Sequence, residues 1–255
     1  MWHTLTCDIR GGHTIASDGE LYLCDDTDYN AIRVFKKREN SFYQTQILGQ
    51  IGTRPHFIFY NNDTKRFYAL SSLGGDFWIL ANEAGVAKIE RHFVIDEIKD
   101  AYVRSFSFID GFLYLISGNG FIWKIELSGG YYRVAEKFLV PDEICGMNYL
   151  MKIDDWFYIT SYQDKTGAIV PNFIRVRDLH TLTMHEYEAL YEKFGFKGTP
   201  YYITSFDDRF FVTEIDQASG VKSFRTDGDK IYDIRTLFFF NGHTPESEKR
   251  KMEKY

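Results

Sequence analysis

Five copies of a β-hairpin pattern constrain the fold of this chain more than any other feature of its sequence. Each copy opens with a polar residue and continues with a short strand, a turn rich in Asp, Asn and Gly, and a second strand that carries an aromatic residue. The copies start 43, 49, 43 and 53 residues apart, and four short strands fit within such a period. We therefore predict an all-β chain that forms a five-bladed β-propeller with four-stranded antiparallel blades. The copies open at His13, His56, Ser105, Asn148 and Tyr201.

Three segments do not follow this repeat. In the longest interval, apolar residues recur at spacings of three and four before Gly195, which predicts a short helical insertion over residues 185–195, packed on the rim. We expect a single propeller over residues 1–243 and a charged tail over residues 244–255, which begins with helix start signals. Residues 2–7 alternate like a strand and could complete the last blade, a place for which residues 230–237 compete.

The composition argues against several kinds of partner. The chain has 30 Lys and Arg against 36 Asp and Glu and no long basic tract, so we do not expect nucleic acid to bind. No apolar run approaches the roughly 20 residues of a membrane span, so no membrane partner is expected. Cys7, Cys24 and Cys145 form no C-x-x-C pair and suit free thiols in a reducing compartment. We expect a cytoplasmic chain, and the sequence indicates no particular protein partner.

One segment of the first blade resembles a known family. A D-G turn, an apolar strand ending in two Asp residues, an Asn and an I-x-V-F strand follow one another over residues 18–35. This segment resembles the blade of NHL-repeat propellers. The resemblance implies the propeller fold, although NHL propellers usually have six blades. It implies no specific activity, because propellers of this broad group include lyases, lactonases and binding scaffolds.

We expect a site where the hairpins open and close. The residue that opens the first strand of an antiparallel hairpin and the residue that closes the second lie at the same end. Because the first strand of a propeller blade lines the central channel, all ten openers and closers should surround one mouth of that channel. All ten are polar, which favours a binding site but also suits hydrogen bonds to loop backbones and ordered waters. The closing residues are Asp25, Ser71, Ser117, Ser161 and Glu214.

The residue types at this mouth indicate three roles. Imidazoles and carboxylates can act as general bases and acids, so the predicted catalytic residues are His13, His56, Asp25 and Glu214. The two histidines could instead hold a divalent metal ion, although no H-x-x-x-H spacing supports it, and no other cofactor is indicated. Guanidinium groups and polar side chains suit a carboxylate, a phosphate or sugar hydroxyls. The predicted ligand-binding residues are Arg54, Arg104, Ser105, Asn148, Tyr201, Asp26 and Ser71.

Three functions remain open from the sequence. The first is binding of a small polar or anionic ligand, such as a sugar or a sugar-derived acid, in the central funnel. The second is a lyase or hydrolase that uses the same residues. The third is a protein-interaction scaffold, for which residues 179–196 offer the surface. Glycosidase, nucleotide-binding and serine-hydrolase activities are disfavoured, because the strand openers are not carboxylates and there is no G-x-S-x-G, P-loop or G-x-G-x-x-G motif.

Overall fold

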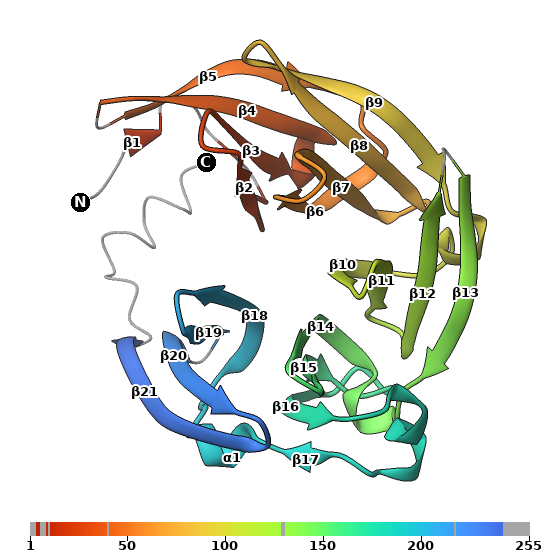
Figure 1. The fold of residues 1–255 in the computed structure, drawn as a ribbon, viewed down its shortest axis with the longest axis vertical. Helices are drawn as coiled ribbons and strands as arrows, with labels where there is room; N and C mark the ends of the chain where they lie inside the picture. Colours follow the sequence, from red (N-terminus) through yellow and green to blue (C-terminus); the bar gives the residue numbers. More distant parts are fainter. Residues whose placement is uncertain are drawn as a thin grey trace. The chain divides into compact units, whose positions relative to one another are not determined.

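Five sheets, each containing four antiparallel strands that are consecutive in the chain, correspond one to one to the predicted blades (Figure 1). The computed structural model describes residues 4–5, 9, 11–39, 41–128, 131–216 and 218–241. Within every sheet the four strands of the blade are hydrogen-bonded in chain order. The prediction of an all-β chain with five four-stranded blades is therefore confirmed.

The strands lie close to the predicted segments. Sheet 1 contains β2 (Ile15–Ser17), β3 (Leu21–Asp26), β4 (Ala31–Arg38) and β5 (Ser41–Leu48). Sheet 2 contains β6 (Thr53–Asn61), β7 (Arg66–Leu73), β8 (Asp76–Glu83) and β9 (Val86–Val94). Sheet 3 contains β10 (Val103–Ile109), β11 (Phe112–Ser117), β12 (Phe121–Ser128) and β13 (Tyr131–Leu139). Sheet 4 contains β14 (Gly146–Ile153), β15 (Trp156–Gln163), β16 (Ile169–Val176) and β17 (Glu188–Ala189), and sheet 5 contains β18 (Thr199–Phe206), β19 (Arg209–Ile215), β20 (Ala218–Asp227) and β21 (Lys230–Asn241).

The hairpin turns have the conformation that their Asp residues favour. Asp110, Asp154 and Asp207 begin the turns of the third, fourth and fifth hairpins with φ values of 50°, 53° and 54°. Among residues with a Cβ, Asp and Asn adopt this left-handed conformation most readily, because their short side chains bond to the local backbone. In the first hairpin, Asp18 Oδ1 accepts hydrogen bonds from the backbone amides of Glu20 and Leu21. The turn residues thus fix the length of each hairpin.

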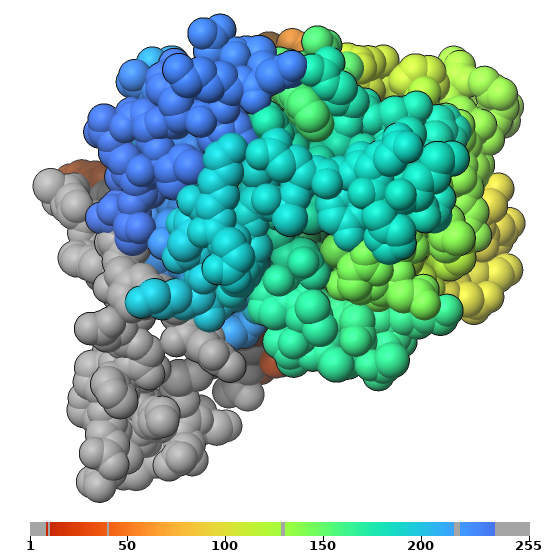
Figure 2. Space-filling view, turned by 90° about the horizontal axis from the view of Figure 1, so that it is seen from below, coloured from red at the N-terminus to blue at the C-terminus, as the bar shows by residue number. Residues whose placement is uncertain are grey.

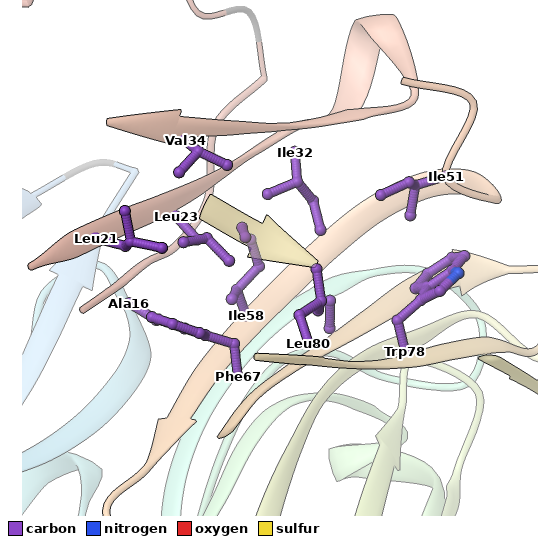
Figure 3. Packing of buried hydrophobic residues seen from close by; sticks show 12 residues of the cluster. Ala16, Leu21, Leu23, Ile32, Val34, Ile51, Ile58, Phe67, Trp78 and Leu80 are labelled. Carbon is purple, nitrogen blue, oxygen red and sulfur yellow. The ribbon is translucent and has the colours of Figure 1, made fainter. Parts of the chain in front are cut away.

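The described residues divide into two compact units. Unit 1 lies within residues 1–119 and 123–137 and holds sheets 1 and 2 with most of sheet 3. In its core, alternate residues of sheet 1 interlock with those of sheet 2 (Figure 3). Leu23, Val34, Phe67 and Leu80 of this cluster are fully buried, and burial of each such side chain contributes roughly 1.5–3 kcal/mol.

Unit 2 lies within residues 120–122 and 138–255 and holds sheets 4 and 5. Its core contains a cluster of aromatic rings. The ring of Phe224 in β20 lies 5.1 Å from Phe194 and 5.7 Å from Tyr158, and Phe173 lies 5.0 Å from Phe194. Aromatic rings of sheets 4 and 5 therefore pack on one another within this unit.

The predicted insertion contains less helix than expected. The segment has a 3-10 turn, η4 (Leu179–Met184), and a single helical turn, α1 (Tyr191–Phe194), which ends at Gly195 with a φ of 63°. Between them, β17 becomes the fourth strand of sheet 4 by pairing with Ile174 and Arg175 of β16. Residues 188 and 189 therefore pair with the edge of the sheet, although the spacing of the apolar residues around them favours a helix. Shorter 3-10 turns are η1 (Thr27–Tyr29), η2 (Asp96–Ile98) and η3 (Asp142–Ile144).

The N-terminal strand does not complete the last blade. β1 (Thr4–Leu5) pairs in parallel with β5 of sheet 1, whereas β21 is the fourth strand of sheet 5. Cys7 and the predicted tail over residues 244–255 lie outside the described residues. The division at residue 243 and the single-domain assignment stay predictions. In the part of the chain that the structure describes, no helix is long and apolar enough to span a membrane.

Candidate functional site

The first strands of sheets 2 and 3 each carry a β-bulge at or next to the residue predicted to open the hairpin. In β6, Pro55 pairs with Ser71 and Phe57 pairs with Leu70, which leaves His56 as the extra residue. In β10 the same shift between Val103 and Ser105 leaves Arg104 as the extra residue. A bulge bends the strand and redirects a side chain, and bulges are frequent beside functional sites. In sheet 3 the bulge thus isolates Arg104, one residue before the predicted opener Ser105.

Asp25 organises the opening of the first blade. Its carboxylate is fully buried and accepts hydrogen bonds from the backbone amides of His13 and Thr14 at 2.6–3.0 Å. The side-chain hydroxyls of Thr14 and Thr27 lie within 3.2 Å of the same carboxylate. These two threonines also reach sheet 2, where Thr27 Oγ1 donates to the Pro55 carbonyl and Thr14 Oγ1 accepts from the Ile58 amide. Asp25 therefore joins the first two blades as well as orienting His13.

Asp25 holds the imidazole of His13 in a fixed orientation. His13 Nδ1 lies 3.0 Å from Asp25 Oδ2. Because the carboxylate can only accept, Nδ1 carries the proton, and in the neutral ring Nε2 carries the lone pair. The His13 side chain is 27% exposed, so this ring is accessible to a small ligand.

His56 lies beneath His13 and is neutral. The two rings stack with centroids 3.9 Å apart, and His56 Nδ1 donates a 2.9 Å hydrogen bond to the Arg104 carbonyl. Burial, followed by the positive charges of His13 and Arg104, lowers the pKa of His56 to about 3. Because a base with so low a pKa removes protons poorly at neutral pH, this pKa disfavours the predicted role of His56 as a catalytic base.

The ring of Tyr102 contacts both predicted arginines. The guanidinium carbons of Arg54 and Arg104 lie 5.7 Å and 5.5 Å from the centre of its ring, within the range of cation–π contacts. Its ring also meets His56 edge-on at 6.3 Å. Arg54 is exposed, and its guanidinium forms no ion pair with any residue that the structure describes. Its backbone has a φ of 59° and is held by a 2.9 Å hydrogen bond from its amide to Asn30 Oδ1.

These residues form one group within unit 1, which we call the histidine cluster. It combines two stacked imidazoles, a buried carboxylate, an aromatic ring and two guanidinium groups. Within the described residues, neither Nε2 atom has a hydrogen-bond partner. The cluster consists of His13, Asp25, Arg54, His56, Tyr102 and Arg104.

The geometry of the histidine cluster does not suit a shared metal ion. The planes of the two imidazoles are only 25° apart, and each lone pair lies in its own ring plane. The lone pairs of two stacked rings therefore point in nearly parallel directions. They do not converge on one metal ion, which would lie about 2 Å from both nitrogens. Asp25 is occupied by hydrogen bonds, and no group of three metal-ligating side chains occurs among the described residues.

Several predicted ligand-binding residues have structural partners instead. The buried Asp26 forms an ion pair with Arg33 at 2.7 Å on the neighbouring strand β4. The Ser71 hydroxyl donates to the Thr53 carbonyl and thereby closes the bulged end of β6. Ser105 is fully buried within β10. Ser71 and Asp26 therefore support the backbone that carries the histidine cluster.

The remaining predicted residues belong to unit 2. Asn148 is the extra residue of a bulge in β14, and its Nδ2 donates to the Pro200 carbonyl at 3.1 Å. The Tyr201 carbonyl accepts from Thr160 Oγ1 at 2.6 Å. Glu214 is buried and accepts from the amides of residues 197 and 198 through Oε1. The grouping of these three residues with the histidines stays a prediction.

The sequence pattern does not indicate Tyr102, Thr14 or Thr27 as site residues. Tyr102 precedes the third hairpin and lies outside the repeat, so position in the repeat did not indicate it. The signal that could have found it is the spacing Tyr102-x-Arg104, which places a ring and a guanidinium two residues apart at a strand entry.

The chain was compared with known proteins. No family model and no curated protein matches its sequence. A candidate 6-phosphogluconolactonase from Bacteroides uniformis is 12% identical, with a TM-score of 0.61 over 89% of this chain and 73% of its own length. A periplasmic gluconolactonase from Pseudomonas aeruginosa is 13% identical, with a TM-score of 0.54 over 89% of this chain and 69% of its own. The β-propeller domain of Cps50 from Myceliophteria thermophila is 10% identical, with a TM-score of 0.57 over 92% and 75%. At such identities these likenesses show the fold alone.

Proposed function

We propose that the chain binds a small polar anion, a sugar-derived acid, at the histidine cluster. This proposal rests on the two stacked imidazoles, which lie beside two guanidinium groups. In each imidazole, Nδ1 donates to a protein oxygen, so Nε2 can accept a hydrogen bond from a ligand. Sugar hydroxyls donate hydrogen bonds to neutral imidazole nitrogens, and a carboxylate pairs with an arginine fork. A sugar acid presents both kinds of group in one small molecule.

Charge favours an acid over a neutral sugar. Arg54 and Arg104 both act on His56 as positive charges. The one carboxylate of the cluster, Asp25, is fully buried and already accepts several hydrogen bonds. A ligand carboxylate would thus meet an exposed arginine rather than a competing acid. Two of the structural neighbours carry names that refer to lactones of sugar acids, which agrees with this choice of ligand.

Calorimetric titration with gluconate and with glucose tests this proposal. We expect gluconate to bind and glucose to bind more weakly. Arg54→Gln should weaken gluconate binding about tenfold or more, which is the effect of losing one charge-assisted hydrogen bond. Arg91→Gln is the matched control, because Arg91 is an exposed arginine of β9 in the same unit. Equal gluconate affinity in the wild type and both variants would refute binding at the histidine cluster.

The His13–Asp25 pair favours a second candidate, hydrolysis of a sugar lactone. Asp25 holds the imidazole in the tautomer whose Nε2 can take a proton from water. The water oxygen would bond to the lactone carbonyl carbon, the ring C–O bond would break, and the leaving alkoxide would take the proton back from His13. The product is a sugar acid, the same ligand that the first proposal assigns to Arg54.

Lactone turnover separates the two candidates. Acid release from gluconolactone, corrected for its spontaneous hydrolysis, should be accelerated by the wild type and lost in His13→Asn. Arg54→Gln should mainly raise KM, because Arg54 would hold the substrate without moving a proton. A protein that binds gluconate but gives only the spontaneous rate is a binding protein, and the hydrolase candidate then fails.

A further inference from the structure

A buried lysine of unit 2 lacks the partner that such a residue usually has. Lys222 in β20 is 5% exposed. Its Nζ donates to the Gly195 carbonyl and to Thr236 Oγ1, both at 3.0 Å, and lies 5.8 Å from the centre of the Phe196 ring. Lysines are almost never this buried unless a carboxylate pairs with them. Within the described part of the chain, no carboxylate lies within ion-pair distance of Lys222.

A cavity lies beside this ammonium group. Its volume is about 400 Å³, and Phe194, Gly195, Lys197, Lys222 and Thr236 line it. Figure 2 shows this side of unit 2, where the segment around α1 lies next to strands β20 and β21. An ammonium has three donors, and two of those of Lys222 are used by protein acceptors, so one remains for a ligand.

Among the described residues that line the cavity there are two lysines and no acid. Lys197 adds a second ammonium and Thr236 adds a hydroxyl, while Phe194 forms an apolar wall. On sheet 5, Glu214 pairs with Gly220 in β20, two residues before Lys222. Glu214 does not line the cavity and turns its Oε1 toward the backbone amides of residues 197 and 198.

We propose that this cavity binds the oxyanion group, phosphate or carboxylate, of a small organic molecule. Lys222 supplies a buried charge, Lys197 an exposed one, and the volume leaves room for an organic part against Phe194. This site is separate from the histidine cluster and does not depend on the function proposed for it. If Lys222 served only to hold the Gly195 carbonyl, its removal would change stability but not anion binding.

Equilibrium dialysis with inorganic phosphate and with acetate tests the proposal on the full chain. We expect Lys222→Met to weaken anion binding about tenfold or more. Lys230→Met, which removes an exposed lysine of the same sheet, should leave anion binding unchanged. Tighter binding of phosphate would indicate a phosphate ester as ligand, and tighter binding of acetate a carboxylic acid. No binding of either probe, or equal binding by the wild type and Lys222→Met, would overturn the proposal.

Lys197→Met keeps the test decisive if Lys222→Met does not fold. Lys197 is exposed, so its replacement should leave the thermal midpoint nearly unchanged. We expect anion binding about threefold weaker or worse, because one of two charges at the cavity is lost. Unaltered phosphate and acetate binding in Lys197→Met would count against the site.

Discussion

The carboxylate of Asp25 is fully buried and accepts hydrogen bonds from two backbone amides and from the imidazole of His13. Asp25→Asn keeps the shape of the side chain but turns an amide group toward donors that need an acceptor. We expect a loss of about 2–4 kcal/mol in the free energy of unfolding, as when one partner of a buried charged network is removed. Denaturant unfolding measures this, with Asp63→Asn in an exposed turn as the control. A loss similar to that of the control would show that Asp25 does not organise the cluster.

His56 makes a second prediction, about pH. Its pKa of about 3 in the folded chain lies below the ordinary value of 6.5, so between these pH values the unfolded chain binds a proton that the folded chain does not. The contribution of His56 to stability is therefore complete above pH 6.5 and is lost as the pH falls toward 3. We expect the wild type to lose about 3 kcal/mol more than His56→Asn between pH 7 and pH 4. Equal pH profiles for the two proteins, measured by denaturant unfolding with His92→Asn as the exposed control, would contradict this.

The repeat predicted several residues of the site and missed others for a physical reason. His13, Asp25 and His56 occupy equivalent ends of hairpins, and strand pairing brings such positions together. Tyr102 stands before its hairpin, where no pairing rule applies. Asp26 was expected to face a ligand, but Arg33 lies on the adjacent strand and pairs with it.

At the scale of elements, the turns of one blade are fixed to the next. In unit 1, Asn82 Nδ2 at the end of β8 donates to Asp18 Oδ2 at 2.8 Å. In unit 2, Trp156 of β15 donates to Asp229 at 2.9 Å, and its ring lies 4.1 Å from the guanidinium of Arg175. Arg175 also donates to the Asp229 carbonyl at 2.8 Å. The turn between β20 and β21 is thereby held on sheet 4.

Trp156→Ala tests this link between blades. We expect a loss of about 2–3 kcal/mol in the free energy of unfolding, because a half-buried ring, a hydrogen bond and cation–π contacts disappear together. Tyr131→Ala, which removes an 80% exposed ring, should change stability by less than about 0.5 kcal/mol. Thermal and denaturant unfolding compare the two variants, and equal losses would show that Trp156 does not fasten the turn.

The element that the sequence predicted least well is the insertion of the fourth blade. Gly195 was correctly expected to end a helix, because glycine adopts the left-handed conformation without steric cost. The helix itself shortens to Tyr191–Phe194. Residues before it gain more from pairing with β16, where Glu188 meets Arg175 across the strands and forms an ion pair with it. Local spacing cannot reveal that a free sheet edge is available.

At the scale of the whole molecule, the fold was predictable and the chemistry only partly so. The five hairpins recur at intervals of 43 to 53 residues, and each has its own turn and strand signals, so the number of blades could be predicted from the sequence. A ligand site is instead made by single side chains at strand ends, and their partners come from the next blade. The stack of His13 on His56 is one such contact, between residues 43 positions apart.

Nuclear magnetic resonance of the histidine ring nitrogens, with and without gluconate, tests the central claim most directly. We predict that His56 is neutral at pH 7 with its proton on Nδ1, and that gluconate shifts the Nε2 resonances of His13 and His56. His92 and His180 should not respond. Unchanged His13 and His56 resonances at saturating gluconate, or shifts confined to the other histidines, would contradict a ligand site at the histidine cluster.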